Sequence, residues 1–358
     1  MTSIRLSHSL ASCHASSVRL SALPSARPPA SVGSWLTRAF GFVSLGIGLA
    51  SAMGCGGPME DSRSQPQAGP ADPMALRSEP SAPMASTMDF MLNKPEINRI
   101  WGSSEKDVWA TGNDGMMLHW NGKVWRRIAV PTGVDLQAIW GASDKDVWAV
   151  GEAGVVIHWD GTSWLRVTTP VPDSSTLNDV WGTSGSNVWA VGDRGVVIQY
   201  NGSAWGAFSL PSINNLLTVW AASTTDAWIG GDLGMLLRWD GTTWNEQQSA
   251  SAAHYLHIRG VSANKVYAAK YPNDIWLFDG SKWAQIGSVY GTRLWMSADN
   301  DVWVYGNSDI YRFNGTMWSR FTIFSNTALW TPSPGKGWAF TSSPSILNFN
   351  GTSWSGAW

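Results

Sequence analysis

The sequence contains a repeated unit, and polar residues that could bind a ligand recur at one place in it. This place is the short turn that follows the second of two Trp-containing runs in the unit. Glu152, Asp193 and Asp232 occupy the equivalent position of this turn in three successive copies. Such an acidic arc suits a cationic, polyhydroxyl or calcium-bridged partner, because loops on a rigid scaffold commonly carry binding groups. Ordinary polar turn composition is the alternative explanation. The candidate ligand-binding residues are Asn113, Glu152, Asp193, Arg194, Asp232 and Asn307.

Other polar positions could in principle hold a metal ion. One carboxylate or amide precedes the second strand-like run of most copies, and we expect it to cap turn amides, because such residues lie one per copy and far apart. His119 and His158 share a position of the third run, which we expect to be solvated. His254 and His257 are a weaker candidate metal pair. We therefore predict no metal and no other cofactor. The capping residues are Asp107, Asp146, Asn187, Asp226 and Asp301.

Catalytic motifs are not found in the sequence. It contains no H-E-x-x-H, G-x-S-x-G or P-loop pattern. A glycosidase normally needs two carboxylates roughly 5–9.5 Å apart at a cleft. A sialidase would also need converging arginines, and the positions of Arg194, Arg259 and Arg293 do not indicate such a cluster. We predict that the protein has no catalytic residues, and a glycosidase-type enzyme is kept as an alternative.

The elements that position these residues follow from an internal repeat. The final Trp of the unit recurs seven times at spacings of 35 to 41 residues, a period typical of repeat architectures. Each unit contains four strand-like runs separated by turn residues, with an Asn-Gly or Asp-Gly pair such as Asp160-Gly161 before the last run. The repeat predicts an all-β, seven-bladed propeller of four-stranded antiparallel blades over residues 89–358.

Tryptophan explains how the predicted blades would pack. A Trp in the first run is followed eight residues later by a Trp in the second, as in Trp140 and Trp148. Large flat rings fill the wedge between neighbouring blades, so these recurrent positions are structural before they are functional. The fifth unit departs most from the pattern, because Arg259 and Tyr267 replace these two residues.

The units resemble the Trp-rich repeat WGxxxxDVWAVGxxGxIxHWDGxxW of exported lipoproteins that are common in myxobacteria. The WDGTSW element at Trp159–Trp164 also resembles the Asp-box hairpin of BNR-repeat propellers. The resemblance covers about 260 residues and implies a propeller fold. In Asp-box proteins these hairpins lie on the rim of the blades, away from the active centre.

The N-terminal segments predict export. An uncharged stretch from Ala39 to Gly54 follows Arg38 and ends at Cys55, in a setting that resembles the lipobox of bacterial lipoproteins. We predict an export signal in residues 1–54 and a lipidated Cys55. Residues 55–88, rich in Pro, Ser, Ala and Gly, would form a flexible linker. A plain cleaved signal and an uncleaved anchor are the alternatives.

Composition and motifs together favour a binding module. With 24 Lys+Arg and 26 Asp+Glu, the chain lacks the basic balance of a nucleic-acid-binding protein. We predict an exported, lipid-anchored monomer at the cell envelope, on the outer membrane or cell surface, that binds an envelope protein or a glycan. A periplasmic or secreted protein and a carbohydrate-binding lectin are the alternatives, and the lectin requires exposed Trp faces. We also predict that a segment near Asp89 to Leu92 pairs with the seventh blade.

Replacing the proposed lipid acceptor tests the predicted anchor. In the Cys55→Ser variant the thiol that would carry the lipid is lost, so the protein should move from the membrane to the soluble fraction. Cell fractionation followed by immunoblotting measures this, with wild type as the reference. An unchanged membrane fraction would place the anchor elsewhere.

Overall fold

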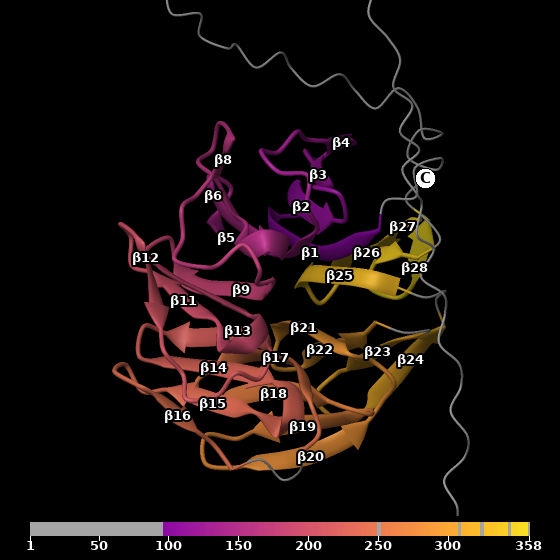
Figure 1. Cartoon of the computed structure of the whole chain (residues 1–358). Helices are drawn as coiled ribbons and strands as arrows, with labels where there is room; N and C mark the ends of the chain where they lie inside the picture. Colours follow the sequence, from indigo (N-terminus) through magenta and orange to yellow (C-terminus); the bar gives the residue numbers. More distant parts are fainter. Residues whose placement is uncertain (1–95, 249–251, 307–308, 323–325, 343–344, 357–358) are drawn as a thin grey trace, which may run out of the picture. The chain divides into compact units, whose positions relative to one another are not determined.

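The fold is a ring of seven sheets. The computed structural model describes residues 96–248, 252–306, 309–322, 326–342 and 345–356. Each sheet has four antiparallel strands in chain order, and we call each sheet a blade (Figure 1). The predicted export signal, Cys55, the linker, the segment near Asp89 to Leu92 and Asn307 lie outside the described residues. Among the residues described, no helix has the length and apolar character needed to cross a membrane.

The first four blades follow one another without interruption along the chain. Blade 1 contains β1 (Ile97–Ser104), β2 (Asp107–Gly112), β3 (Met117–Trp120) and β4 (Trp125–Arg127). Blade 2 contains β5 (Leu136–Ser143), β6 (Asp146–Gly151), β7 (Val156–Trp159) and β8 (Trp164–Arg166). Blade 3 contains β9 (Leu177–Ser184), β10 (Asn187–Gly192), β11 (Val197–Tyr200) and β12 (Trp205–Phe208). Blade 4 contains β13 (Leu216–Ser223), β14 (Asp226–Gly231), β15 (Leu236–Trp239) and β16 (Trp244–Glu246).

The remaining three blades complete the ring. Blade 5 contains β17 (Tyr255–Ser262), β18 (Lys265–Lys270), β19 (Asp274–Phe278) and β20 (Trp283–Ser288). Blade 6 contains β21 (Arg293–Ala298), β22 (Asp301–Tyr305), β23 (Asp309–Phe313) and β24 (Trp318–Thr322). Blade 7 contains β25 (Asn326–Ser333), β26 (Lys336–Thr341), β27 (Ile346–Phe349) and β28 (Trp354–Gly356). Short 3-10 turns, η1 (Glu152–Gly154), η2 (Asp193–Gly195) and η3 (Asp232–Gly234), join the second and third strands of blades 2, 3 and 4.

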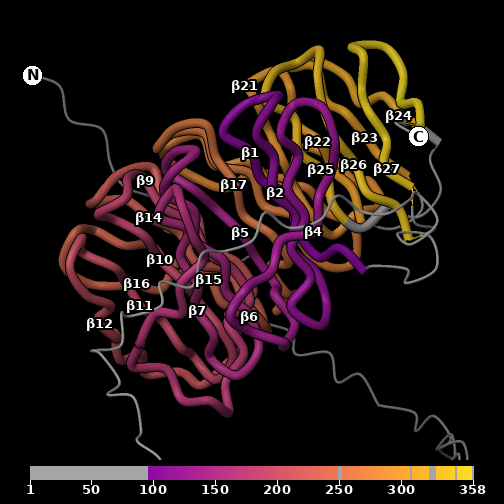
Figure 2. The backbone as a smooth tube through the Cα atoms, turned by 90° about the horizontal axis from the view of Figure 1, so that it is seen from above, coloured from indigo at the N-terminus to yellow at the C-terminus, as the bar shows by residue number. Residues whose placement is uncertain are grey.

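Contacts between first strands close the ring. The first strand of each blade contacts the first strand of the next, and β25 of blade 7 contacts β1 of blade 1. The indigo beginning and the yellow end of the described chain therefore lie together (Figures 1 and 2). Closure packs every first strand between two neighbouring first strands, so no blade stands at an open end of the array and the inner strand edges are protected. The predicted seven-bladed propeller is confirmed.

Trp rings fill the wedges between blades, as predicted. The second-strand Trp of one blade meets the fourth-strand Trp of the next at nearly a right angle. Trp109 and Trp164 have ring centroids 5.3 Å apart, and Trp148 and Trp205 repeat the contact at 5.3 Å. Trp338 of blade 7 closes the series on blade 1, with its ring centroid 5.6 Å from that of Trp125. Edge-to-face pairs of this kind contribute about 0.5–1.5 kcal/mol each beyond their buried area.

First-strand Trp rings pack against glycines of the following blade. A Cβ at Gly141 would lie 2.5 Å from the Trp101 ring, and one at Gly182 would lie 2.6 Å from the Trp140 ring. The same contact joins blade 7 to blade 1, where a Cβ at Gly102 would lie 2.8 Å from Trp330. These distances leave no room for a methyl group, so the glycines set how closely the first strands approach one another.

Adding a methyl group at one of these glycines should weaken the ring. Gly141→Ala forces the Trp101 ring to move, and overpacking of this kind costs about 1–3 kcal/mol of unfolding free energy. Gly206→Ala is the matched control, because a Cβ there meets nothing within 4 Å. Urea unfolding measures both variants. Equal stability of the two variants would contradict the close-approach argument.

The turns between third and fourth strands share one side-chain arrangement. In blade 2, Asp160 Oδ1 accepts hydrogen bonds from the Thr162 backbone N–H at 2.8 Å, the Thr162 hydroxyl at 2.6 Å and the Ser163 N–H at 2.9 Å. Gly161 follows with φ of +92°, in the region that favours glycine. The hydrogen bonds from Thr162 and Ser163 lower the pKa of Asp160 to about 2. The same type of turn lowers the pKa of Asp279 to about 2 and also lowers the pKa of Asp240.

These lowered pKa values predict an acid-sensitive contribution to stability. The carboxylates are favoured in the folded state, so their contribution is present above the ordinary Asp pKa of about 3.9 and is lost as the pH falls toward 2. The four other turns use Asn121, Asn201, Asn314 and Asn350 in the same arrangement. The triple variant Asp160→Asn, Asp240→Asn, Asp279→Asn should therefore lose less thermal stability than wild type between pH 5 and pH 2. Parallel curves of melting temperature against pH would refute this role.

Candidate functional site

In five blades the first residue of the second strand pairs with a side chain of the third strand. Asp107 Oδ1 lies 2.6 Å from His119 Nε2, and the His119 ring stacks on Trp109 with centroids 3.9 Å apart. Residues two apart on a strand share a face, and His119 is the register partner of Trp109. All three side chains therefore meet on one face of blade 1. Asp107 therefore pairs with a strand side chain instead of capping turn amides as expected, and His119 keeps 24% of its side chain exposed while making this contact.

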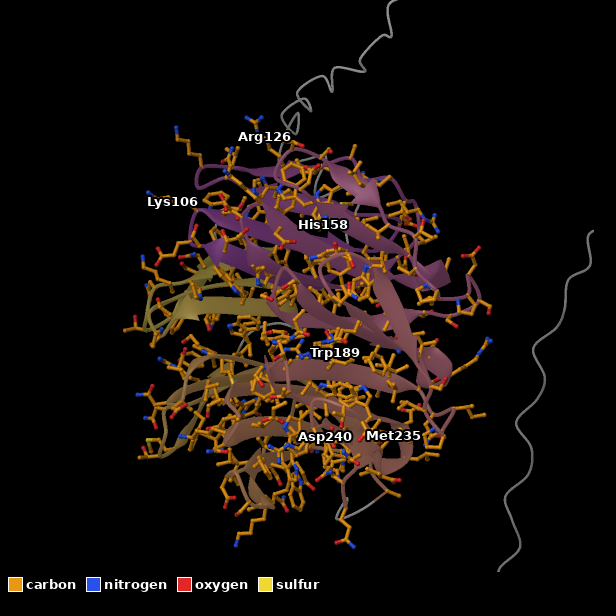
Figure 3. All side chains as sticks on the ribbon, turned by 90° about the vertical axis from the view of Figure 1, so that its left-hand side faces the viewer. Lys106, Arg126, His158, Trp189, Met235 and Asp240 are labelled. Carbon is orange, nitrogen blue, oxygen red and sulfur yellow. The ribbon has the colours of Figure 1, made fainter. Side chains whose placement is uncertain are left out.

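The same pairing recurs with different chemistry in other blades. His158 Nε2 lies 2.7 Å from Asp146 in blade 2, where Figure 3 shows it among the strands while Lys106 extends from the edge of the molecule. Gln199 donates to Asn187 at 2.8 Å in blade 3. In blades 4 and 6 the third-strand residue of the pair is arginine. The remaining pairs are Arg238 with Asp226 and Arg312 with Asp301. This position therefore joins strands within a blade.

The predicted acidic arc lies in the turns between second and third strands. Asp193 Oδ1 accepts a hydrogen bond from Asn178 Nδ2 at 3.0 Å. Asp232 accepts one from Asn215 Nδ2 at 3.1 Å and lies 2.8 Å from His254 Nδ1. These two carboxylates therefore attach their turns to neighbouring segments. The Glu152 side chain is exposed. Their role in ligand binding stays a prediction.

The other predicted residues on this face also hold the chain together. Arg194 has φ of +56°, its backbone N–H donates to Asn215 Oδ1, and its guanidinium donates to the Ser174 carbonyl at 3.3 Å. Asn113 accepts a hydrogen bond from the Asn98 side chain at 3.0 Å. Asn98 belongs to β1, so this bond connects an innermost strand to the turn face, the face that carries the turns between second and third strands.

A charged cluster lies where the first strands converge. Two positions before the first-strand Trp, the side chain can reach the inner strand of a neighbouring blade. Blades 2 and 7 have alanine there and blade 4 has threonine, but the other four blades have charged residues or histidine. The seven residues in chain order are Arg99, Ala138, Asp179, Thr218, His257, Arg293 and Ala328.

Arg259 and Asp179 form a buried ion pair that joins three blades. Arg259 replaces the first-strand Trp of blade 5, and its two terminal nitrogens donate to the two Asp179 oxygens at 3.0 and 3.1 Å. Only 6% of the Arg259 side chain and 1% of the Asp179 side chain are exposed. Asp179 also accepts from the Thr218 hydroxyl and the Val219 N–H of blade 4. A buried pair like this is stable only when its remaining hydrogen-bonding capacity is satisfied.

Two further arginines converge on one acceptor beside this pair. Arg99 and Arg293 both donate to the backbone carbonyl of Asn98, although Arg293 belongs to blade 6. Both guanidinium groups are within electrostatic range of Arg259 and Asp179. Burial, together with the neighbouring arginines, lowers the pKa of Arg99 and of Arg293. Sequence positions did not indicate an arginine cluster, but the fold brings Arg259 and Arg293 together, whereas Arg194 lies elsewhere, in the turn beside Ser174.

His257 is a neutral member of the same cluster. Its Nδ1 accepts a hydrogen bond from the Leu294 N–H at 3.1 Å, which places the ring proton on Nε2. Burial holds the pKa of His257 well below its usual range, and the adjacent Arg259, Arg99 and Arg293 lower it further. Its Nε2 is buried and has no hydrogen-bond partner among the described residues. The imidazole therefore offers one unused neutral donor.

The cluster lies between the turn face and a layer of indoles. Arg99 is the register partner of Thr111, next to the turn that begins after Gly112. Two residues farther along the first strands, Trp181 and Trp295 of blades 3 and 6 approach with centroids 6.3 Å apart. The Arg259 guanidinium lies 4.6 Å from the Trp181 ring centroid. The predicted turn face is therefore the face nearer to the basic cluster.

The outer surface offers shallower sites. A groove of 530 Å³ between blades 2 and 3 is bordered by His158, Pro170 and Tyr200. Trp148 and Trp205 also line it, but only 2% and 7% of these residues are exposed. No Trp among the described residues is an exposed one. Several of them, including Trp120, Trp159 and Trp276, are partly exposed, so the lectin alternative stays open.

Comparison with known proteins identifies the fold but no family. No protein-family model and no curated protein matches the chain. A solved structure of YCF48 bound to D1 peptide is 14% identical, with a TM-score of 0.55 over 72% of this chain and 92% of that one. YCF48 from Cyanidioschyzon merolae is 15% identical, with a TM-score of 0.57 over 72% and 96%. The WD40 propeller domain of Doa1 is 10% identical, with a TM-score of 0.56 over 73% and 91%.

The chain is a seven-bladed β-propeller. Its Trp-rich repeats form the blades, and identities this low show the fold alone. The resemblance to exported myxobacterial lipoproteins concerns the repeat motif, and it stays a prediction.

Proposed function

We propose that this propeller is a non-catalytic protein-binding module, exported and held at the cell envelope by a lipid on Cys55, with its binding centre at the axial basic cluster. The cluster is defined as Arg99, Arg293, His257 and the Arg259–Asp179 pair. One observation carries the proposal: three arginines converge at the centre of the ring, around the Asp179 carboxylate. Like charges brought together away from water destabilise a fold, so a use other than packing accounts for them.

The other blades show that packing does not need these charges. Ala138 and Ala328 occupy the same strand position in blades 2 and 7 and are fully buried. Six of the seven blades place Trp where blade 5 has Arg259. Apolar residues therefore pack well at these two strand positions in the other blades, and the charged residues are exceptions to that pattern. Activity often requires such locally unfavourable arrangements.

Protein binding also agrees with the fold. The solved neighbour YCF48 is described as bound to a D1 peptide, and the WD40 domain of Doa1 has the same architecture. A closed ring holds loops from several blades on one face without rearrangement, which lowers the ordering cost of association. Fold alone does not assign function, so the proposal depends on the axial cluster.

A glycosidase acting on an acidic sugar is a second candidate, because the arginine cluster satisfies one requirement of a sialidase. Tyr305 is within electrostatic range of Arg99 and Arg293, and tyrosine serves as the nucleophile in sialidases. Against this, Arg259 is already paired with Asp179, and only 3% of Tyr305 is exposed. Hydrolysis of a fluorogenic N-acetylneuraminic acid glycoside, lost in Tyr305→Phe, would favour this candidate.

Capture of an envelope protein tests the main proposal. The full chain carrying Cys55→Ser serves as soluble bait for envelope extracts, and captured proteins are identified by mass spectrometry. We expect Arg99→Gln with Arg293→Gln to reduce capture of a specific partner at least tenfold. Arg166→Gln, on the exposed outer strand β8, is the matched control and should retain capture.

A second bait separates the two candidate surfaces. Replacing Glu152, Asp193 and Asp232 with Asn removes the acidic arc and leaves the axial cluster unchanged. If this triple variant loses the partner and the arginine variant keeps it, the binding centre is the arc. A partner retained equally by all variants would contradict both assignments.

A further inference from the structure

We propose that the groove on the outer surface between blades 2 and 3 binds a neutral sugar. This outer groove is a surface hollow of 530 Å³ lined by aromatic rings and hydroxyl groups. The residues that carry the inference are Trp148, His158, Thr168, Thr169, Tyr200 and Ser203. The groove shares no residue with the axial basic cluster, so the inference goes beyond the proposed function and does not depend on it.

The chain that connects blade 2 to blade 3 is longer than the equivalent connections. Thirteen positions separate Trp164 from Leu177 at the start of β9, whereas eleven separate the corresponding residues after blades 1, 3 and 4. The connection contains Pro170 and Pro172, which lack the backbone N–H that could pair with another strand. The segment from Val167 to Pro170 borders the outer groove. The longer connection therefore forms one wall of the groove.

The aromatic residue that ends the third strand also differs at this interface. Blade 3 has Tyr200, and the other six blades have Trp or Phe at the equivalent position. In blades 1, 2 and 4 the indole N–H of this residue donates to a carbonyl of the turn between the first and second strands, at 3.1 Å in each blade. Tyrosine has no ring N–H for that bond. Tyr200 instead borders the outer groove, is partly exposed, and brings the only phenol at this position. The equivalent residues are Trp120, Trp159, Trp239, Phe278, Phe313 and Phe349.

The rings in the groove are held in place before any ligand arrives. His158 stacks on Trp148 with ring centroids 4.0 Å apart, and Tyr200 contacts the same indole at 4.8 Å. The Trp148 N–H donates to Asp146 Oδ1 at 3.0 Å, and His158 Nε2 lies 2.7 Å from the same oxygen. His158 and Tyr200 remain partly exposed. Their rings therefore offer a preformed apolar surface to the C–H groups of a sugar ring.

The polar groups that border the groove are mainly hydroxyls. A hydroxyl can donate one hydrogen bond and accept two, and the hydroxyls of a sugar have the same capacity. Thr168, Thr169, Tyr200 and Ser203 each bring one, and Ser203 Oγ, which donates to Asn201 at 2.8 Å, can still accept. Among the described residues that line the groove, none is Asp, Glu, Lys or Arg. A charged ligand would lose water there without gaining a counter-charge, so the lining favours a neutral polyhydroxyl ligand.

Binding to immobilised glycans tests the proposal on the full chain carrying Cys55→Ser. The array presents neutral glycans of hexoses, N-acetylhexosamines and deoxyhexoses beside glycans that end in sialic acid, a uronic acid or a sulfated sugar. The neutral disaccharide that binds most strongly is then titrated in solution by isothermal calorimetry. We expect at least one neutral glycan to bind, and the charged glycans to bind at least ten times more weakly.

Removal of the phenol assigns the binding to the outer groove. Tyr200→Phe keeps the ring, and the fold accepts Phe at this position in blades 5, 6 and 7. This variant should weaken binding of the disaccharide at least fivefold and leave the melting temperature unchanged. Tyr290→Phe is the matched control, because Tyr290 is an exposed tyrosine of another connection, and it should bind as wild type does.

Obstruction of the groove is a second, independent variant. Ala204 is exposed and lines the groove, and blade 6 has Met317 at the equivalent position of its turn. Ala204→Met therefore places a side chain that the turn accepts into the space of the ligand, and it should abolish detectable binding. Ser163→Met makes the same change at the equivalent turn of blade 2 and should retain binding.

Several outcomes would overturn the proposal. Binding of charged glycans alone, or of none, would reject a neutral sugar as the ligand. Neutral glycan binding that Tyr200→Phe and Ala204→Met leave unchanged would place the site elsewhere. Aromatic grooves also bind proline-rich segments, so tighter binding of N-acetyl-tetraproline amide than of any sugar, lost in Ala204→Met, would assign the groove to a peptide. Sugar binding without capture of a protein partner would reject the proposed function alone.

Discussion

The contact between a first-strand indole and a glycine of the next blade sets the geometry of the whole ring. A Cβ at Gly102, Gly141 or Gly182 would overlap the Trp of the preceding blade, so the first strands approach more closely than side chains would otherwise permit. The same contact between Trp330 and Gly102 closes blade 7 on blade 1. Because the strands converge in this way, residues far apart in sequence meet near the axis. Arg293 can then donate to the Asn98 carbonyl across 195 residues of sequence.

Blade 5 departs from this packing rule and introduces charge. Arg259 stands where six other blades have Trp, and it reaches Asp179 of blade 3 while lying over the Trp181 ring. A buried ion pair gains little over apolar packing, because removing two charges from water offsets much of their attraction. The pair therefore places polar groups next to Arg99 and Arg293 at a cost in stability. The binding role proposed for the axial basic cluster would give this arrangement a use.

Features that recur in every blade could be predicted from the sequence, because each has a local cause. Features that depend on one residue in one blade could not. Seven units, four strands each and Asp-Gly or Asn-Gly turns were predictable, because each feature recurs and each has a local cause, such as the positive φ of Gly161. Pairing of Asp107 with His119 was not predicted, because it requires the strand register. The axial cluster was also missed, although Arg259 was visible as an exception to the Trp pattern. The position two before the first-strand Trp is arginine in blades 1 and 6 and varies among the others, so no regular repeat marked it, and only ring closure brings Arg99 and His257 to Arg293.

A double-mutant cycle on the buried pair tests most directly whether blade 5 exchanges packing for a charged site. Asp179→Ala and Arg259→Trp each leave a buried charge without its partner, and each should lower the unfolding free energy by about 3–5 kcal/mol. The double variant installs residues that other blades have at these positions, so its stability in urea unfolding should return to within about 1 kcal/mol of wild type. Losses that simply add in the double variant would contradict the account, because the pair would then be part of the required packing.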